Sequence, residues 1–301
     1  MCDIWKDSSK TELSTGELER HLEDIDRLSV QWVVLSGGEP LMHSDLFRFC
    51  SLLRSRRIRV TVLSTGLLLG RYAPKIVDCV DDVIISLDGP STVHDRIRRV
   101  PGAYALLESG IDAIHQREPG FPITGRCTVQ RQNHFCLCET ARAGKRLGLK
   151  SLSFLAADVT SEAFNRSGGW SFERQASIAL NEFEIAVLER ELDALFEEWR
   201  YCGFVLESWE KLRRIALHYR AHLGLCKPIA PLCNAPWVSA VIEANGTVRP
   251  CFFHRPIGSL KDQSLLNVLN GPAAVAFRTK LDVANNPVCC RCVCSLNWRK
   301  V

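Results

Sequence analysis

A Gly-Gly-Glu-Pro tetrapeptide directly follows the apolar run 31–36 and consists of Gly37, Gly38, Glu39 and Pro40. Because the two glycines carry no Cβ, the backbone can approach a bound molecule closely here. The carboxylate of Glu39 can accept a charge-assisted hydrogen bond from an ammonium group. The tetrapeptide therefore predicts a site for a molecule that carries an amino group, and the alternative is an ordinary strand-to-helix connection.

A second set of reactive side chains lies near the C-terminus of this chain, which has 14 cysteines. Cys233, Gly246 and Cys251 form the pattern C-x12-G-x4-C, in which a hairpin turn at Gly246 brings two distant cysteines together. Cys289 and Cys292 add two more thiols at C-x2-C spacing. Four thiolates can hold a [4Fe-4S] cluster or a tetrahedral zinc ion, so the pattern predicts metal ligation.

Two neighbouring cysteines leave the choice of the second ligand pair open. Cys290 and Cys294 flank the C-x2-C pair, which itself favours Cys289 with Cys292. Most other cysteines lie in apolar segments, where a buried free thiol is the expected role. These are Cys50, Cys79, Cys127, Cys136, Cys138 and Cys202.

Short apolar runs alternate with amphipathic segments along the first half of the chain, which is the βα rhythm of a parallel sheet. The predicted strands are 31–36, 59–64, 82–87, 122–129 and 149–155. A long helix is expected over 173–200 and another near 207–223, before the composition shifts to Pro and Cys around 226–228. We therefore expect two domains, 1–224 and 225–301.

Composition restricts the classes of partner. A hydrophobic content of 46% in 301 residues suffices for one large domain and a smaller one. The net charge is only +4, and the basic runs 54–57 and 96–99 are interrupted, which favours solvated faces over a nucleic-acid stripe. Neither a signal peptide nor an apolar stretch of about 18 to 20 residues is present. We expect a cytoplasmic protein without nucleic-acid or membrane partners.

The Gly-Gly-Glu-Pro turn, together with Met1-Cys2-Asp3-Ile4-Trp5 upstream of it, resembles the radical S-adenosylmethionine (SAM) enzymes. In that family a Cys-x3-Cys-x2-Cys loop after the first barrel strand binds a [4Fe-4S] cluster, and the turn holds the amino group of SAM. Cys2 matches the last cysteine of that loop. The resemblance implies a partial (β/α)6 TIM-like barrel whose first strand, with two cluster cysteines, is expected upstream of Met1.

The same resemblance gives roles to polar residues at the ends of the other predicted strands. The segment Ser64-Thr65-Gly66 resembles a Thr-Asn-Gly turn of the family in which Thr65 and Gly66 align, although a helix cap explains it equally well. Ser86 and Asp88 are placed by the ribose and the substrate, and Arg126 faces the SAM carboxylate, for which a planar guanidinium is suited. Further implied SAM contacts include Leu155, whose strand passes the adenine with its backbone groups.

The C-terminal cysteine pattern resembles the SPASM or "twitch" domain of many radical SAM enzymes, which carries auxiliary clusters. The full SPASM pattern has a later C-x5-C-x3-C run that is absent before Val301, so one auxiliary [4Fe-4S] cluster is expected. The implied activity is reductive SAM cleavage followed by hydrogen abstraction from a peptide or small metabolite, with flavodoxin or ferredoxin as reductant. A non-catalytic electron-transfer protein and a zinc-binding scaffold are the alternatives.

Overall fold

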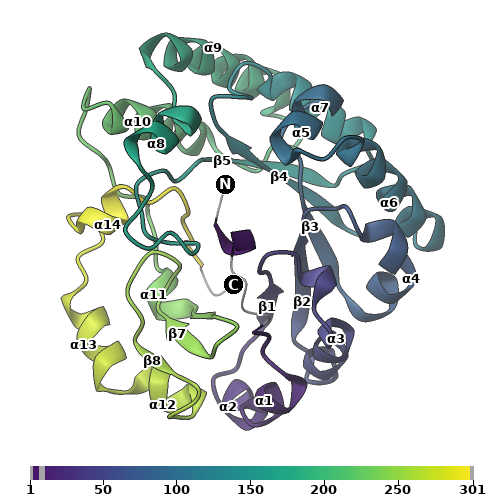
Figure 1. Cartoon of the computed structure of the whole chain (residues 1–301), viewed down its shortest axis with the longest axis vertical. Coiled ribbons are helices and arrows are strands. Elements are labelled where there is room, and N and C mark those ends of the chain that lie inside the picture. The colour runs from purple at the N-terminus through teal and green to yellow at the C-terminus, as the bar shows by residue number, and fades with distance from the viewer. Residues whose placement is uncertain (1–2, 7–10, 299–301) are drawn as a thin grey trace. The chain divides into compact units, whose positions relative to one another are not determined.

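The computed structural model describes residues 3–6 and 11–298 (Figure 1). The chain divides into two compact units, which we name the sheet unit and the cysteine-rich unit. The sheet unit comprises Trp32–Ala157 and Phe172–Lys227. The cysteine-rich unit comprises Met1–Gln31, Asp158–Ser171 and Pro228–Val301. Within the described residues, no helix is both long and apolar enough to cross a bilayer.

The described residues of the sheet unit form a five-stranded parallel sheet in the chain order β1-β2-β3-β4-β5. All five predicted strands are present, with ends shifted by at most two residues, and the expected α/β partial barrel is confirmed. Their bounds are β1 Trp32–Leu35, β2 Arg59–Ser64, β3 Asp82–Ser86, β4 Ile123–Val129 and β5 Ser151–Ala156.

Helices cover one face of this sheet, where the strands bury β-branched residues such as Val60, Val62 and Ile85. Burial on this face stabilises each strand, because every fully covered aliphatic side chain contributes roughly 1.5 to 3 kcal/mol. The elements between and after the strands are η2 Pro40–Met42, α3 Leu46–Ser55, α4 Leu69–Cys79, α5 Ser91–Arg98, α6 Ala103–Arg117, α7 Leu137–Arg146, α8 Phe172–Ile178, α9 Glu182–Trp199 and α10 Trp209–His222.

The long helix predicted over 173–200 is wrong in one respect, because the structure divides it into α8 and α9. Asn181 is the N-cap of α9, and its side chain accepts a hydrogen bond from the backbone N–H of Glu184. The Glu184 carboxylate accepts the Asn181 N–H in return, which completes a capping box. This reciprocal cap favours a new helix start over continuation, although the apolar spacing of α9 is as expected.

The cysteine-rich unit contains short elements around a three-stranded antiparallel sheet of order β6-β7-β8 within the described residues. The hairpin predicted at Gly246 joins β6 to β7, and its φ of +83° explains the glycine. Between Cys233 and β6 the chain forms one helical turn, α11. The elements are η1 Ile4–Lys6, α1 Thr15–Glu19, α2 Leu22–Arg27, α11 Ala235–Val238, β6 Val241–Ile242, β7 Thr247–Arg249, β8 Gly258–Ser259, α12 Leu265–Asn270, α13 Pro272–Lys280 and α14 Pro287–Cys290.

The segment 158–171 of the cysteine-rich unit is organised around a buried arginine. The guanidinium of Arg166 is fully buried and forms an ion pair with Asp158. Its Nε also donates to the carbonyl of Ala163 at 2.7 Å. The same segment binds Asp3, because the indole N–H of Trp170 donates to the Asp3 carboxylate at 2.9 Å. A buried arginine with this many acceptors fixes the loop, since an unpaired charge there would be costly.

Candidate active site

Glu39 lies at the centre of a hydrogen-bond network at the carboxyl ends of β1 and β2. One carboxylate oxygen accepts the backbone N–H of Leu41 at 3.1 Å and the hydroxyl of Ser64 at 2.9 Å. The other accepts the backbone N–H of Thr65 at 2.8 Å and the hydroxyl of the same residue. Because β1 and β2 are paired neighbours, their ends meet, and the predicted residues Glu39, Ser64 and Thr65 are brought together.

Gly37 leaves open space before Glu39, as the sequence pattern indicates. Gly37 has a φ of +154°, and a Cβ built on it would meet no heavy atom within 4 Å. Gly38 is exposed, whereas Pro40 is buried at the first position of η2. A ligand can therefore approach the backbone of the turn from the side that the glycines leave free.

Arg126 lies in β4 on the less buried face of the sheet. It is paired in register with Ser86 of β3 and with Ser153 of β5. Leu155 follows Ser153 by two residues, so its side chain leaves β5 on the same face. Within the described residues, the buried Nε of Arg126 has no hydrogen-bond partner. A buried donor without an acceptor is rare in proteins, and this one suits an anionic ligand.

Asp88 is placed differently from the other predicted SAM contacts, because its side chain is only 1% exposed. Its carboxylate forms an ion pair with Arg98, with 2.7 Å between Oδ2 and the guanidinium nitrogen. The amide of Asn133 donates to its backbone carbonyl at 2.9 Å. These contacts are internal to the fold, so a contact between Asp88 and the ribose stays a prediction.

Glu207 is a carboxylate that the sequence patterns did not indicate. It accepts the hydroxyl of Ser153 at 2.7 Å and the backbone N–H of Phe154 at 2.9 Å. Burial is the main cause that raises the pKa of Glu207 above its usual value. Glu207 lies 54 residues after Ser153 in a segment without a motif, so no local signal could have identified this contact.

The four predicted auxiliary-cluster cysteines all lie in the cysteine-rich unit, and they influence one another electrostatically. Burial raises the pKa of Cys289 to about 11, with further contributions from Cys251, Cys233 and Cys290. Burial likewise raises the pKa of Cys292, followed by the effects of Cys294, Cys251 and Cys233. The cysteines from the hairpin and from the C-terminal run are therefore gathered in one region.

Thiols of the C-terminal run also form hydrogen bonds with backbone carbonyls. The thiol of Cys290 donates to the carbonyl of Ala284 at 3.2 Å, whereas the thiol of Cys292 donates to the carbonyl of Cys294 at 2.6 Å. Cys2 lies outside the described residues. Among the residues that the structure describes, no three His, Cys, Asp or Glu side chains are arranged around a single metal ion.

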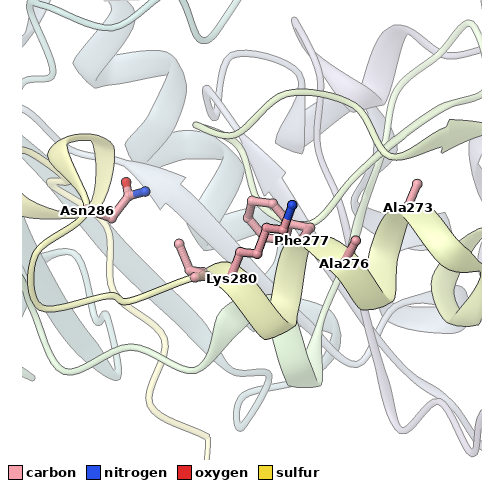
Figure 2. Close-up of a pocket in the computed structure, with 6 residues that line it drawn as sticks. Ala273, Ala276, Phe277, Lys280 and Asn286 are labelled. Atoms are coloured by element: carbon pink, nitrogen blue, oxygen red, sulfur yellow. The ribbon is translucent and has the colours of Figure 1, made fainter.

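A pocket of about 330 Å³ lies along α13 in the same unit (Figure 2). The side chains of Phe277 and Lys280 extend from α13, and Asn286 lies at its far end. Asn286 is also the N-cap of α14, where its side chain accepts the backbone N–H of Cys289 at 3.2 Å. The pocket therefore borders α14, which carries the candidate ligand Cys289 and the alternative Cys290.

Comparison with known proteins defines the class to which this fold and these sites belong. The sequence model of the radical SAM superfamily matches residues 1–136, and that of an iron-sulfur cluster-binding domain, SPASM, matches residues 233–293. The chain belongs to the radical SAM superfamily and carries a C-terminal SPASM domain. The cofactors of this class are a [4Fe-4S] cluster, SAM and an auxiliary cluster in the SPASM domain.

Curated relatives align with less than half of the chain. An AdoMet-dependent heme synthase of Methanosarcina barkeri is 30% identical over 46% of this chain and 40% of its own length. A pre-heme d1 synthase of Dinoroseobacter shibae is 36% identical over 42% of this chain and 32% of its own length. The chain thus spans about a third to two-fifths of the curated relatives it matches.

Solved structures share the fold over nearly the whole chain. Native anSMEcpe with bound AdoMet covers 96% of this chain and 84% of its own, with a TM-score of 0.66 at 16% identity. Streptococcus suis SuiB bound to the precursor peptide SuiA covers 98% of this chain and 68% of its own, with a TM-score of 0.64 at 13% identity.

The residues present fit both cofactors. For SAM, the unpartnered Nε of Arg126 suits the carboxylate, and the carboxylate of Glu39 suits the ammonium group. The open space at Gly37 lets the ligand approach the backbone closely. For an auxiliary cluster, Cys251 and Cys289 are half-buried thiols that influence each other electrostatically, and thiolates are the usual ligands of iron.

Proposed function

We propose that this protein is a radical SAM oxidoreductase that cleaves SAM reductively and abstracts a hydrogen atom from a peptide or small metabolite. The observation that supports this most strongly is the pair formed by the Glu39 network and the unpartnered Nε of Arg126 on one sheet. An amino-acid group carries one ammonium and one carboxylate, and these two side chains have the complementary charges. Membership of the family supplies the reaction class.

Each side chain has a separate task in holding SAM. Arg126 binds the carboxylate through two parallel N–H donors, a geometry that lysine cannot reproduce. Glu39 accepts a hydrogen bond from the ammonium group, while the backbone N–H groups of Leu41 and Thr65 orient its two oxygens. Gly37 lets the ligand reach the backbone. The iron-sulfur cluster, when bound, supplies the electron that breaks the sulfonium bond, and the protein contributes orientation and exclusion of water.

In the cysteine-rich unit we propose Cys233, Cys251, Cys289 and Cys292 as the ligands of one auxiliary [4Fe-4S] cluster, within a domain that spans 225–301. The C-x2-C spacing favours Cys289 with Cys292, and both thiols are influenced electrostatically by Cys233 and Cys251. Cys290 stays the alternative, because its thiol and that of Cys292 both donate to backbone carbonyls. We also propose Cys2 as one ligand of the SAM-binding cluster.

The substrate is proposed as a small metabolite or a peptide, with tetrapyrroles to be assayed first. Two curated relatives are named as synthases of heme and of pre-heme d1. A structural neighbour was solved with a precursor peptide, which makes peptides the second class to assay. A flavodoxin or ferredoxin is the proposed reductant.

The test is anaerobic turnover of iron-loaded protein that carries the family's complete Cys-x3-Cys-x2-Cys loop. With SAM and dithionite it should release 5'-deoxyadenosine and methionine. Arg126→Lys should require much more SAM, whereas Arg131→Lys is the matched control, because Arg131 instead pairs with Glu184 at 2.9 Å. Protein that binds iron but cleaves no SAM would favour the electron-transfer alternative, and protein that binds zinc in place of iron would favour the scaffold.

A further inference from the structure

His254 lies three residues after the candidate ligand Cys251, in the sequence Phe252-Phe253-His254. Its side chain is buried, with the residue 8% exposed. Its Nε2 lies 3.4 Å from the sulfur of Cys289, another candidate ligand from a segment 35 residues away. The imidazole therefore joins the hairpin side of the cysteine cluster to its C-terminal side.

His254 is held both at its ring and at its backbone. The ring of Phe277 packs edge-on against it, with 4.9 Å between centroids and an interplanar angle of 67°. The backbone carbonyl of His254 accepts a hydrogen bond from Arg249 at 3.1 Å, and Arg249 is itself fixed by Glu243 at 2.6 Å. A donor fixed in this way loses little conformational entropy when it forms its hydrogen bond. Packing alone would explain a buried ring, but it does not require a ring nitrogen to face a sulfur.

We propose that His254 donates a hydrogen bond from Nε2–H to the thiolate sulfur of Cys289 and so raises the reduction potential of the auxiliary cluster. This inference rests on the proposed function, because it requires Cys289 to be a cluster ligand. One-electron reduction adds negative charge that spreads onto the ligand sulfurs, and an N–H group aimed at a sulfur stabilises that charge. The proton stays on the imidazole throughout, so His254 is a positioning residue that acts through Cys289.

The experiment measures the midpoint potential of the auxiliary cluster by EPR-monitored redox titration. It uses the full chain with Cys2→Ala, which removes a thiolate proposed for the other cluster. His254→Leu removes the donor and retains an apolar side chain. His254→Gln can place an amide N–H where Nε2 was, whereas His254→Asn has an amide too short to reach that position. Phe277→Leu is the control for loss of packing, because it leaves the donor in place.

We expect His254→Leu and His254→Asn to disfavour reduction about tenfold, which corresponds to roughly 59 mV for a one-electron couple. His254→Gln and Phe277→Leu should stay near the parent potential. Equal potentials in all variants would overturn the proposal, as would a Phe277→Leu shift as large as that of His254→Leu. Loss of the whole cluster in both the Gln and Asn variants would also overturn it, because His254 would then be needed for assembly.

A spectroscopic readout is independent of the potential. In the reduced parent, ENDOR should detect an exchangeable proton coupled to the cluster that disappears in His254→Leu and returns in His254→Gln. Direct nitrogen coupling of ligand strength would instead identify His254 as an iron ligand and refute the hydrogen bond. If the parent binds no iron, the proposed function itself fails, which is distinguishable from an iron-loaded cluster whose potential is insensitive to His254.

Discussion

Replacing Glu39 with Gln should weaken SAM binding without disrupting the sheet. The carboxylate receives four hydrogen bonds, from Leu41 N–H, Ser64 O–H, and the N–H and O–H of Thr65. Two carboxylate oxygens offer about four lone-pair sites, so the network alone saturates Glu39. The ammonium group of SAM must therefore displace one hydroxyl donor, most simply that of Ser64 or Thr65, while the backbone donors keep the carboxylate in place.

The size of the effect follows from the charge of the lost acceptor. A hydrogen bond that involves a charged group contributes about 1.5 to 3 kcal/mol, so Glu39→Gln should reduce affinity roughly ten- to a hundredfold. Ser64→Ala removes a competing donor but keeps the charge, so its affinity should stay within about threefold of the parent. That variant is the matched control for a merely local disturbance of the network.

Anaerobic calorimetry with SAM, on iron-loaded protein that carries the complete Cys-x3-Cys-x2-Cys loop, measures both affinities. Thermal unfolding of the same samples separates lost contacts from lost structure. If Glu39→Gln binds SAM as tightly as the parent, the carboxylate does not contact the ammonium group. An equal loss of affinity in Ser64→Ala would show that the network, and not the charge, determines binding.

Three further changes test other parts of the structure. In the Cys2→Ala background, Cys251→Ala should remove nearly all of about four irons per chain, as counted by chemical iron assay. Cys202→Ala should remove none, because Cys202 is exposed and lies in the sheet unit. Burial holds the pKa of His94 at about 4, below its usual 6.5, so between these pH values the unfolded chain binds a proton that the folded chain excludes. The unfolding free energy from urea titrations should therefore fall by up to about 3 kcal/mol as the pH is lowered from 6.5 to 4. His94→Gln should flatten this dependence, and an unchanged slope would contradict the assignment. Arg166→Met should lower the unfolding free energy by about 3 to 5 kcal/mol, because it leaves a buried carboxylate unpaired; a loss below about 1 kcal/mol would show that the pair is not needed.

Local patterns in the sequence determined the sheet, its polar strand ends and the hairpin. Apolar runs bounded by turn residues predicted all five parallel strands, because strand length and burial follow from neighbouring residues. The Gly-Gly-Glu-Pro turn gave the position of Glu39 for the same reason. Gly246 identified the hairpin, since only a few residues tolerate its positive φ.

The division of the predicted long helix into α8 and α9 also has a local cause, which apolar periodicity does not indicate. The sequence predicts one helix over 173–200, whereas the capping box of Asn181 and Glu184 starts a second helix, α9. Apolar periodicity favours one continuous helix, whereas the cap residues favour a new helix start at the same positions. The hydrogen bonds between Asn181 and Glu184 stabilise the new start.

Only the tertiary structure decided which side chains meet across long stretches of chain. Glu39 contacts Ser64 from 25 residues away, His254 reaches Cys289 from 35, and Glu207 reaches Ser153 from 54. No short pattern encodes such pairs, because they depend on how strands and loops are brought side by side. The sequence determined which groups could perform the chemistry. Tertiary packing determined which of these groups are paired and which are not, and the Nε of Arg126 has no hydrogen-bond partner within the described residues.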